Sequence, residues 1–447
     1  MQWISRWLRT ADVALVALSV VVGVGTALLA VAFRWLIRVF TLVFSGYADY
    51  AAHPGAAHPG LEWAGRFFVV LAPAVAGLAY GPIVRAFAPE ARGHGVPEVM
   101  VAVAHHGGRI RPQVPAVKAL ASALCIGGGG SVGREGPIVQ IGSAWGSTLG
   151  ILARLNAPRL RVLVACGAAG GIAATFNAPL AGVFFAMELI LGDFTAQVFG
   201  MVVLASVTSA AIGRAILGDD PFLMLPSFSL EHHWEYALVA LLGLIAGLLG
   251  VLFSRVLYAI EDLCDAWWRW PEWARPAVGG LALGVLLLAL PQLYGVGYPV
   301  LGKAVGGGYA VWFLLLLAAG KMVATSLTIG IGGSGGVFAP SLFLGAMLGA
   351  AFGEIAQVAG AHIAPVGAYA VIGMAAVFAG AARAPITAVV MLFELTGEYS
   401  VILPLMVAVA LATGLSHRFS PDTIYTRKLS RRGVDLDRSE IIAVGDR

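Results

Sequence analysis

The sequence predicts an all-α polytopic membrane protein built from two duplicated halves, and three observations lead to this fold class. First, 59% of the 447 residues are hydrophobic and 12% are charged, with a mean hydropathy of +0.87. A soluble domain of this length needs more charge to cover its surface. Second, 58 glycines and 22 prolines are too many for smooth spans, which indicates broken membrane helices whose freed backbone lines a cavity or is buried in protein. Third, two Gly- and Pro-containing passages each occur twice, in the same order.

Basic residues predict the orientation of the spans, because they gather on the cytoplasmic side. The first apolar stretch, residues 11–36, is too long for a signal-peptide core and is interpreted as a retained span. Residues 41–63 and 219–234 contain no Lys or Arg and are expected to face outward. Both termini are expected on the cytoplasmic side of the membrane. The basic groups that mark this side are Arg6 and Arg9, Arg85 to Arg111, Arg154 to Arg161, Arg255 to Arg275, and Arg418 to Arg432.

Charge and cysteine content exclude several function classes. The formal charge of +4 is small and its basic residues are scattered, so nothing indicates nucleic-acid binding. Cys125, Cys166 and Cys264 are isolated, with no paired or metal-binding spacing. We therefore expect no metal site, no disulfide framework and no cofactor, and we expect that the chain is not an enzyme.

One duplicated passage links a proline to a glutamate. Residues 177–179 (Asn-Ala-Pro) lead through an apolar run to Glu188, and residues 383–385 (Arg-Ala-Pro) lead through a similar run to Glu394. The spacing from proline to glutamate is nine in both copies, and the copies are 206 residues apart. The repetition predicts a shared structural role for both glutamates, such as bonding a neighbouring backbone group.

The second duplicated passage is a Gly-x-x-x-Pro element, at residues 133–137 and, 203 residues later, at 336–340. A third copy lies at residues 93–97, after a basic loop. Duplication with interrupted segments at matching positions points to a transporter's binding site. We expect a first membrane half at 1–216, a second at 217–430, a short cytoplasmic tail at 431–447, and no soluble regulatory domain.

These elements are suited to binding an anion. Glycine permits close backbone approach and proline fixes the first turn of a following helix. A helix start exposes unpaired N–H groups and the positive end of the macrodipole. Several starts that converge in a membrane would bind a small anion without a full positive charge, which would hold the ion too tightly for rapid passage. The residues concerned are Gly93, His94, Gly95, Val96 and Pro97; Gly133, Arg134, Glu135, Gly136 and Pro137; and Gly336, Val337, Phe338, Ala339 and Pro340.

Glu135 is the candidate gate. It lies between glycines at an expected helix start, with apolar sequence on both sides. An ionisable residue at membrane depth is costly and indicates a function. Its carboxylate can occupy the same N–H groups as an anion, and protonation would let it leave. An ion pair with Arg134 is the competing interpretation, which we disfavour because adjacent helical residues point apart.

The stretch Gly133-Arg134-Glu135-Gly136-Pro137 resembles the gating-glutamate motif of the CLC family of chloride channels and chloride/proton antiporters. Residues 336–340 resemble its second anion-site motif, residues 424–426 resemble the segment of its inner-gate tyrosine, and Lys118 falls where the family often has a lysine. The resemblance covers about residues 11–430. It implies an inverted-repeat fold of about eighteen helices, many broken or not fully spanning, and a homodimer with one pore per subunit. It also implies a prokaryotic inner-membrane protein of the short type without nucleotide-binding domains.

By the same resemblance, the N–H groups of Val337 and Phe338 hold a central anion, and the Tyr425 hydroxyl donates from the inner side. An interfacial aromatic anchor is the alternative role for Tyr425. Gly95, Val96 and His94 form the first anion motif. His94 stands where serine is usual: its ring could donate to the anion, or it could face cytoplasmic water. Anion preference among chloride, nitrate, fluoride and bicarbonate therefore stays open.

Two further departures bear on the mechanism. Leu189 and Met100 stand where antiporters of the family usually carry glutamates on the inner proton path. The main hypothesis is a chloride/proton antiporter gated by Glu135, and the alternative is a passive chloride-selective channel. A third hypothesis is an intramembrane serine hydrolase, since Ser334 lies in a Gly-x-Ser-x-Gly pattern. That pattern, like the dinucleotide-type glycines at 128–133, needs a preceding strand, whereas we expect a membrane-length helix before each.

Overall fold

The computed structural model describes residues 12–218, 232–359 and 363–434, and this part of the chain folds into seventeen α-helices without a β-strand. The α-helices are α2 (Asp12–Ser45), α3 (Phe68–Phe87), α4 (Val96–His105), α5 (Val114–Gly127), α6 (Glu135–Leu152), α7 (Ala157–Phe176), α8 (Pro179–Phe185), α9 (Ala196–Leu217), α10 (Glu235–Trp267), α11 (Arg275–Ala289), α12 (Tyr298–Val305), α13 (Val311–Gly330), α14 (Phe338–Val358), α15 (Val366–Ala382), α16 (Pro385–Thr396), α17 (Ile402–Phe419) and α18 (Thr426–Ser430). Short helical turns are η1 (Tyr50–Ala52), η2 (Glu62–Ala64), η3 (Pro89–Ala91), the π-helical η4 (Ala186–Leu191), η5 (Glu272–Ala274), η6 (Pro291–Leu293) and η7 (Tyr399–Val401).

Length and composition divide these helices into two groups. Within the described residues, nine helices are long and apolar enough to cross a membrane, and several others, such as α4, α5 and α8, are too short. This mixture confirms the predicted membrane fold with broken helices. The first span is longer than predicted: α2 continues to Ser45, nine residues beyond 36, because the apolar sequence persists around Arg34 and Arg38.

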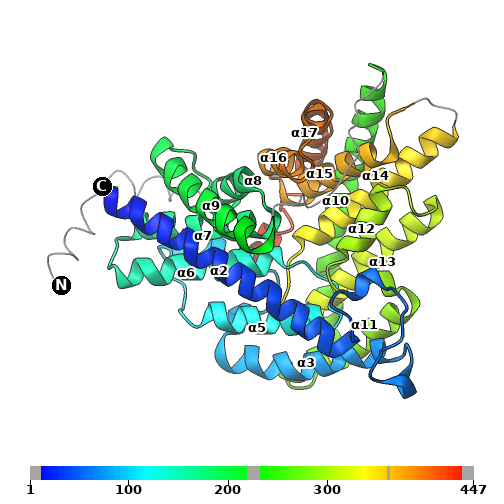
Figure 1. Ribbon diagram of the computed structural model, residues 1–447, viewed down its shortest axis with the longest axis horizontal. Coiled ribbons are helices and arrows are strands. Elements are labelled where there is room, and N and C mark those ends of the chain that lie inside the picture. The colour runs from blue at the N-terminus through cyan, green and yellow to red at the C-terminus, as the bar shows by residue number, and fades with distance from the viewer. Residues whose placement is uncertain (1–11, 219–231, 360–362, 435–447) are drawn as a thin grey trace.

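The helices form two equivalent series. The eight helices α2 to α9 recur in the same order as α10 to α17, and α6 packs on α7 as α14 packs on α15. Figure 1 shows α6, α7 and α9 on one side of the molecule and α12, α13 and α14 on the other. The predicted duplication of the two halves is therefore observed as a repeat of eight helices. The predicted division at residue 216 falls at the end of α9, and it stays a prediction that each half is a domain.

The duplicated turns have the same backbone conformation. Asn177 after α7 and Arg383 after α15 are left-handed, with φ of 58° and 53°. In each copy an alanine with φ near −120° follows, and a proline then begins the next helix. Pro at the first helical position costs no hydrogen bond, since that N–H has no partner in a helix. The sequence repeat therefore encodes a repeated sharp reversal between two helices.

Glu188 and Glu394 each bond the helix of the other half. The Glu188 carboxylate accepts from the N–H groups of Ile386 (3.2 Å) and Thr387 (2.9 Å) and from the Thr387 hydroxyl (2.7 Å), at the start of α16. Reciprocally, Glu394 accepts from the N–H groups of Leu180 (3.0 Å) and Ala181 (2.7 Å), at the start of α8. A carboxylate satisfies the free N–H groups of a helix start and complements its dipole. The predicted structural role of the pair is confirmed.

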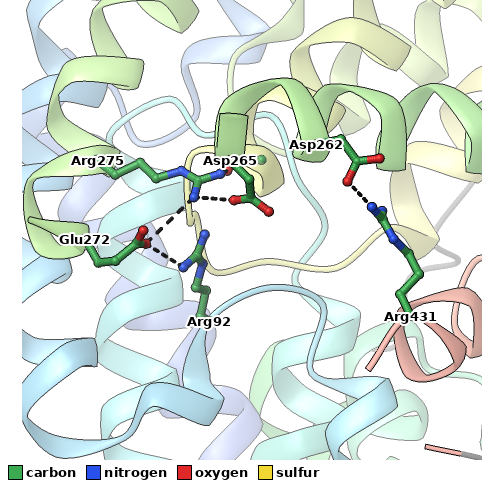
Figure 2. Close-up of polar contacts among 7 residues, drawn as sticks. Arg92, Asp262, Asp265, Glu272, Arg275 and Arg431 are labelled. Carbon is green, nitrogen blue, oxygen red and sulfur yellow. Dashed lines mark hydrogen bonds and ion pairs between the residues drawn. The ribbon is translucent and has the colours of Figure 1, made fainter. Parts of the chain in front are cut away.

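An ion-pair network braces the loop that precedes α4 (Figure 2). Arg92 binds Glu272 at 2.9 Å, and the buried Arg275 binds Asp265 at the end of α10 at 2.5 Å. Arg431, after α18, pairs with Asp262. Because Arg92 directly precedes the first Gly-x-x-x-Pro element, this network fixes that element against the ends of α10 and α11. The predicted outward loop 219–234 and the tail 431–447 lie mostly outside the described residues.

Candidate functional site

The three Gly-x-x-x-Pro elements meet at one place. Gly133 and Gly336 exchange two backbone hydrogen bonds, of 2.8 and 2.7 Å. Gly93 donates to the Gly333 carbonyl (3.0 Å) and accepts from the Gly335 N–H (3.3 Å). The loops before α4, α6 and α14 therefore lie together although about 240 residues separate the outermost two. This convergence is the arrangement that the anion-site hypothesis requires.

Glycine is required at this junction because the backbones touch. A Cβ on Gly95, whose φ is +86°, would lie 2.7 Å from the Gly136 carbonyl. A Cβ on Gly336 would lie 2.7 Å from the Gly136 nitrogen, and one on Gly136 would meet the His94 carbonyl. Real Cβ atoms do not approach backbone so closely, so each side chain would push the helix starts apart.

Glu135 is the first residue of α6, as predicted, and its side chain is 1% exposed. Its Oε1 atom accepts a hydrogen bond from the Tyr298 hydroxyl. Its Oε2 atom is buried beside Gly133 and Ala339, at the start of α14, and has no hydrogen-bond partner. The acid therefore projects from one helix start toward another. The guanidinium of Arg134 stacks on the Tyr298 ring, 5.0 Å from its centroid, so both neighbours engage the same tyrosine.

Tyr298 was not among the residues singled out from the sequence. It lies in Gly295-Val296-Gly297-Tyr298-Pro299, which repeats the Gly-x-Gly-x-Pro pattern of residues 93–97 at an offset of 202. Each copy precedes a short helix, α12 or α4. The repeated glycines and proline were a usable signal for this fourth element. The contact from Tyr298 to Glu135 was not, because it joins residues 163 positions apart.

Two buried lysines secure the loops of this fourfold arrangement. Lys118 Nζ donates to the carbonyls of Ala91 (2.9 Å) and Gly93 (2.8 Å). Lys321, 203 residues later, donates to the carbonyls of Gly295 (2.9 Å) and Val296 (3.0 Å). With the carbonyls held by ammonium groups, the N–H groups of these loops point the other way. The lysines therefore orient the helix starts and do not present free charge to an anion.

His94 is fully buried, at 0% exposed, and neither ring nitrogen has a hydrogen-bond partner. The alternative that it faces cytoplasmic water is therefore wrong. Its ring packs edge-on against Tyr258, with centroids 6.3 Å apart. A buried imidazole N–H without a partner is costly, so the ring has unused donor capacity directly before Gly95 and Val96, where α4 begins.

The second anion motif has the expected backbone form. Val337 is the N-cap and Phe338 the first residue of α14, so their N–H groups have no partner within the helix. The Phe338 ring packs against Phe378, with centroids 4.5 Å apart, which fixes the turn. Tyr425 is 1% exposed, directly before α18. An aromatic anchor at the lipid–water interface would be exposed, so that alternative for Tyr425 is wrong.

A cavity of about 690 Å³ lies beside the α2–α3 loop and the end of α9, and it is lined by Arg134 and Tyr298, the two residues that neighbour or contact Glu135. In the predicted orientation this is the outer side, and we call it the outer cavity. Its charged lining residues are Arg34, Arg38, Asp49, Arg134 and Arg214, and Tyr298 also lines it. Partial desolvation raises the pKa of the Asp49 carboxyl, an effect that the charge of Arg134 opposes. Arginines therefore dominate the charge of the outer cavity and favour the entry of anions.

The residues tied to the other hypotheses are also placed. Leu189 and Met100 are buried, at 5% and 3% exposed. Ser334 is buried and its hydroxyl donates to the Ala91 carbonyl (2.7 Å) and contacts the Ser122 hydroxyl (2.8 Å). It thus has a structural role, with no histidine bonded to it in the described chain. The helix before the glycines at 128–133 is shorter than expected, since α5 has 14 residues. In the described residues no group of acidic, His and Cys side chains could hold a metal.

Comparisons with known proteins agree with this architecture. A family model described as voltage gated chloride channel matches residues 76–417. A ClcB-like chloride channel protein of Ralstonia nicotianae is 33% identical over 430 residues, covering 95% of this chain and 98% of the relative. The H(+)/Cl(−) exchange transporter ClcA of Vibrio cholerae is 35% identical over 361 residues, covering 78% and 76%. The crystal structure of a slow cyanobacterial Cl−/H+ antiporter superposes with a TM-score of 0.83 at 26% identity, covering 94% and 97%. This integral membrane protein therefore belongs to the CLC family of chloride channels and chloride/proton antiporters.

Proposed function

We propose that this protein transports chloride, or a similar small anion, in exchange for protons, with Glu135 as both gate and proton acceptor. The observation that carries the proposal is the position of the Glu135 carboxylate: it projects from the start of α6 to the start of α14 and is buried with one oxygen unpartnered. Relatives named as exchange transporters and antiporters support the same activity.

The geometry supplies a mechanism from the residues of this chain. The outer cavity concentrates anions, and the free N–H groups of Val337 and Phe338 bind one at the start of α14. The ionised Glu135 carboxylate competes for the same positive helix starts. Protonation removes its charge, so the acid loses this attraction and an anion takes its place. Release of the proton on the other side of the gate would couple the two movements in opposite directions.

The inner side of the pathway is assigned to His94 and Tyr425. His94 has an unpartnered ring beside the start of α4, where the N–H groups of Gly95 and Val96 could bind an entering anion. Tyr425 would donate its hydroxyl from the C-terminal segment. The protein would act as a homodimer with one pathway per subunit in a prokaryotic inner membrane, with both termini cytoplasmic and no cofactor.

A passive chloride channel is the second candidate function, and one observation favours it. Leu189 and Met100 are buried apolar side chains, without a titratable group, where glutamates would relay protons from the inner side. The nearby Glu188 is engaged by the start of α16 and is not free to replace them. In the exchanger, water would have to deliver protons to Glu135 directly.

Reconstituted vesicles distinguish the two functions. A chloride gradient should drive protons uphill through an exchanger, read with a pH-sensitive dye beside a chloride electrode, and cannot do so through a channel. Glu135→Gln should abolish proton movement and keep chloride flux, whereas Glu354→Gln, a glutamate late in α14, should change neither. Proton movement that persists in Glu135→Gln, or a chloride gradient that moves no protons in the wild type, rejects the exchange mechanism.

A further inference from the structure

Tyr298 connects the two halves of the molecule at the gate. Its hydroxyl donates to Glu135 Oε1, so a residue of the second half holds the acid of the first. Because an ionised carboxylate only accepts hydrogen bonds, the phenol must be the donor in that state. Tyr298 also lines the outer cavity, so one side chain contacts both this cavity and the buried acid.

The backbone of Tyr298 is fixed, which makes the contact a defined one. Tyr298 is the first residue of α12 and follows Gly297, whose φ is +92°. A Cβ on Gly297 would lie 3.1 Å from the Phe343 ring of α14. The Lys321 ammonium donates hydrogen bonds to the carbonyls of Gly295 and Val296, the two residues before Gly297. The Arg134 guanidinium stacks on the Tyr298 ring and so also limits the movement of that side chain.

We propose that Tyr298 is an outer latch that holds the ionised Glu135 side chain in the anion pathway and releases it on protonation. This inference rests on the gating role proposed for Glu135. A hydrogen bond to a charged acceptor is about twice as strong as one between neutral groups. The latch therefore favours the ionised, blocking form over the protonated, mobile form, and it sets both the transport rate and the pH at which the gate opens.

The hydroxyl can be removed without removing the ring. In Tyr298→Phe the stacking surface for Arg134 remains, and Glu135 loses its donor. Protonation then becomes easier, so the midpoint of the transport–pH curve should move to higher pH by about one unit, and the chloride rate near neutral pH should rise about tenfold. The exchange ratio should be unchanged, because the proton acceptor is still present.

Tyr294→Phe is the matched control. Tyr294 also lines the outer cavity, but its hydroxyl donates to the Gly127 carbonyl at 2.6 Å. Its removal should leave the pH midpoint in place. A shift of equal size in both variants would mean that a general loosening of the cavity is responsible, and would overturn the latch.

A double substitution separates this inference from the proposed function. In a Glu135→Gln background there is no ionised carboxylate to hold, so adding Tyr298→Phe should not raise the chloride rate further. If it raises the rate as much as in the wild type, Tyr298 acts elsewhere and the latch is rejected. If Glu135→Gln itself has no effect on proton movement, the gating role fails, and that result is recognised without any Tyr298 variant.

Discussion

Glu188 caps the start of α16, as Glu394 caps the start of α8. We therefore predict that Glu188→Ala causes a large and specific loss of stability. The Glu188 carboxylate accepts three hydrogen bonds, of 2.7 to 3.2 Å, from the first turn of α16. A hydrogen bond to a charged group contributes about 1.5–3 kcal/mol, and partial exposure of Glu188 places each bond at or below the lower end of this range. At about 1 kcal/mol for each of the three bonds, we expect Glu188→Ala to lower the free energy of unfolding by roughly 3 kcal/mol.

Glu188→Gln should cause a smaller loss of stability for the same reason. Glutamine keeps one acceptor oxygen for the donors of Thr387 but places its amide N–H₂ against the N–H group of Ile386, so it should lose roughly half as much as alanine. Unfolding can be followed in mixed detergent micelles by the fluorescence of the 11 tryptophans. The reciprocal variant Glu394→Gln should lose a similar amount, because Glu394 accepts two bonds from the start of α8.

The decisive test measures both the unfolding stability and the proton and chloride transport of each Glu188 variant. If Glu188 is a cap, proton exchange per chloride should be unchanged in the folded fraction of Glu188→Gln. This reasoning would be refuted by a Glu188→Gln variant that is as stable as the wild type in the detergent titration but no longer moves protons. Such a result would make Glu188 a proton carrier, and its contacts with α16 would not contribute to stability.

Two other variants test the inner side and the ion-pair network. His94→Ser should change the ratio of chloride flux to nitrate and fluoride flux several-fold. The reason is that it replaces a large hydrogen-bond donor without a partner by a small one at the start of α4. An unaltered series of anion fluxes would show that His94 does not contact the anion. Arg275→Met should lower the free energy of unfolding by about 1–3 kcal/mol, chiefly because it leaves the Gly330 carbonyl without its donor, while water can solvate the exposed Asp265 carboxylate. Loss of transport in a fully stable variant would instead indicate a direct role.

Helix starts and the repeated turns could be predicted because they depend on local sequence. Proline and glycine predict a helix start at each Gly-x-x-x-Pro element, and α6 and α14 indeed begin within these elements, at Glu135 and Phe338. The nine-residue spacing to Glu188 and Glu394 indicated a shared role, although the partner of each could not be inferred, because each bonds the opposite half of the chain.

Burial of polar side chains could not be predicted in the same way. His94 follows a basic loop, which fits cytoplasmic exposure, yet Tyr258 of α10 covers its ring. Tyr425 follows the final apolar run, which fits an interfacial position, yet it is enclosed by the fold. For His94 the covering residue is 164 positions away along the chain, so a local pattern around His94 holds no signal for its burial.

The duplicated frame also shows where the two halves must differ. Glu135 and Phe338 occupy the same position of the Gly-x-x-x-Pro element, each as the first residue of its helix. One is an acid that can lose or gain a proton, and the other is an aromatic ring packed on Phe378. Two acids at this junction would repel each other and could not both stay ionised when buried. Two apolar residues would leave no group to compete with the anion.

The same logic applies to the Gly-x-Gly-x-Pro elements. His94 in the first copy corresponds to Val296 in the second, and Val96 corresponds to Tyr298. The repeat thus places one polar ring at each element but at different positions: an imidazole before α4 and a phenol at the start of α12. Inverted halves make a pathway that is accessible from two sides. A gate that opens to one side at a time needs those sides to differ, and in this chain the differences lie at Glu135, His94 and Tyr298, within a backbone frame that is otherwise repeated.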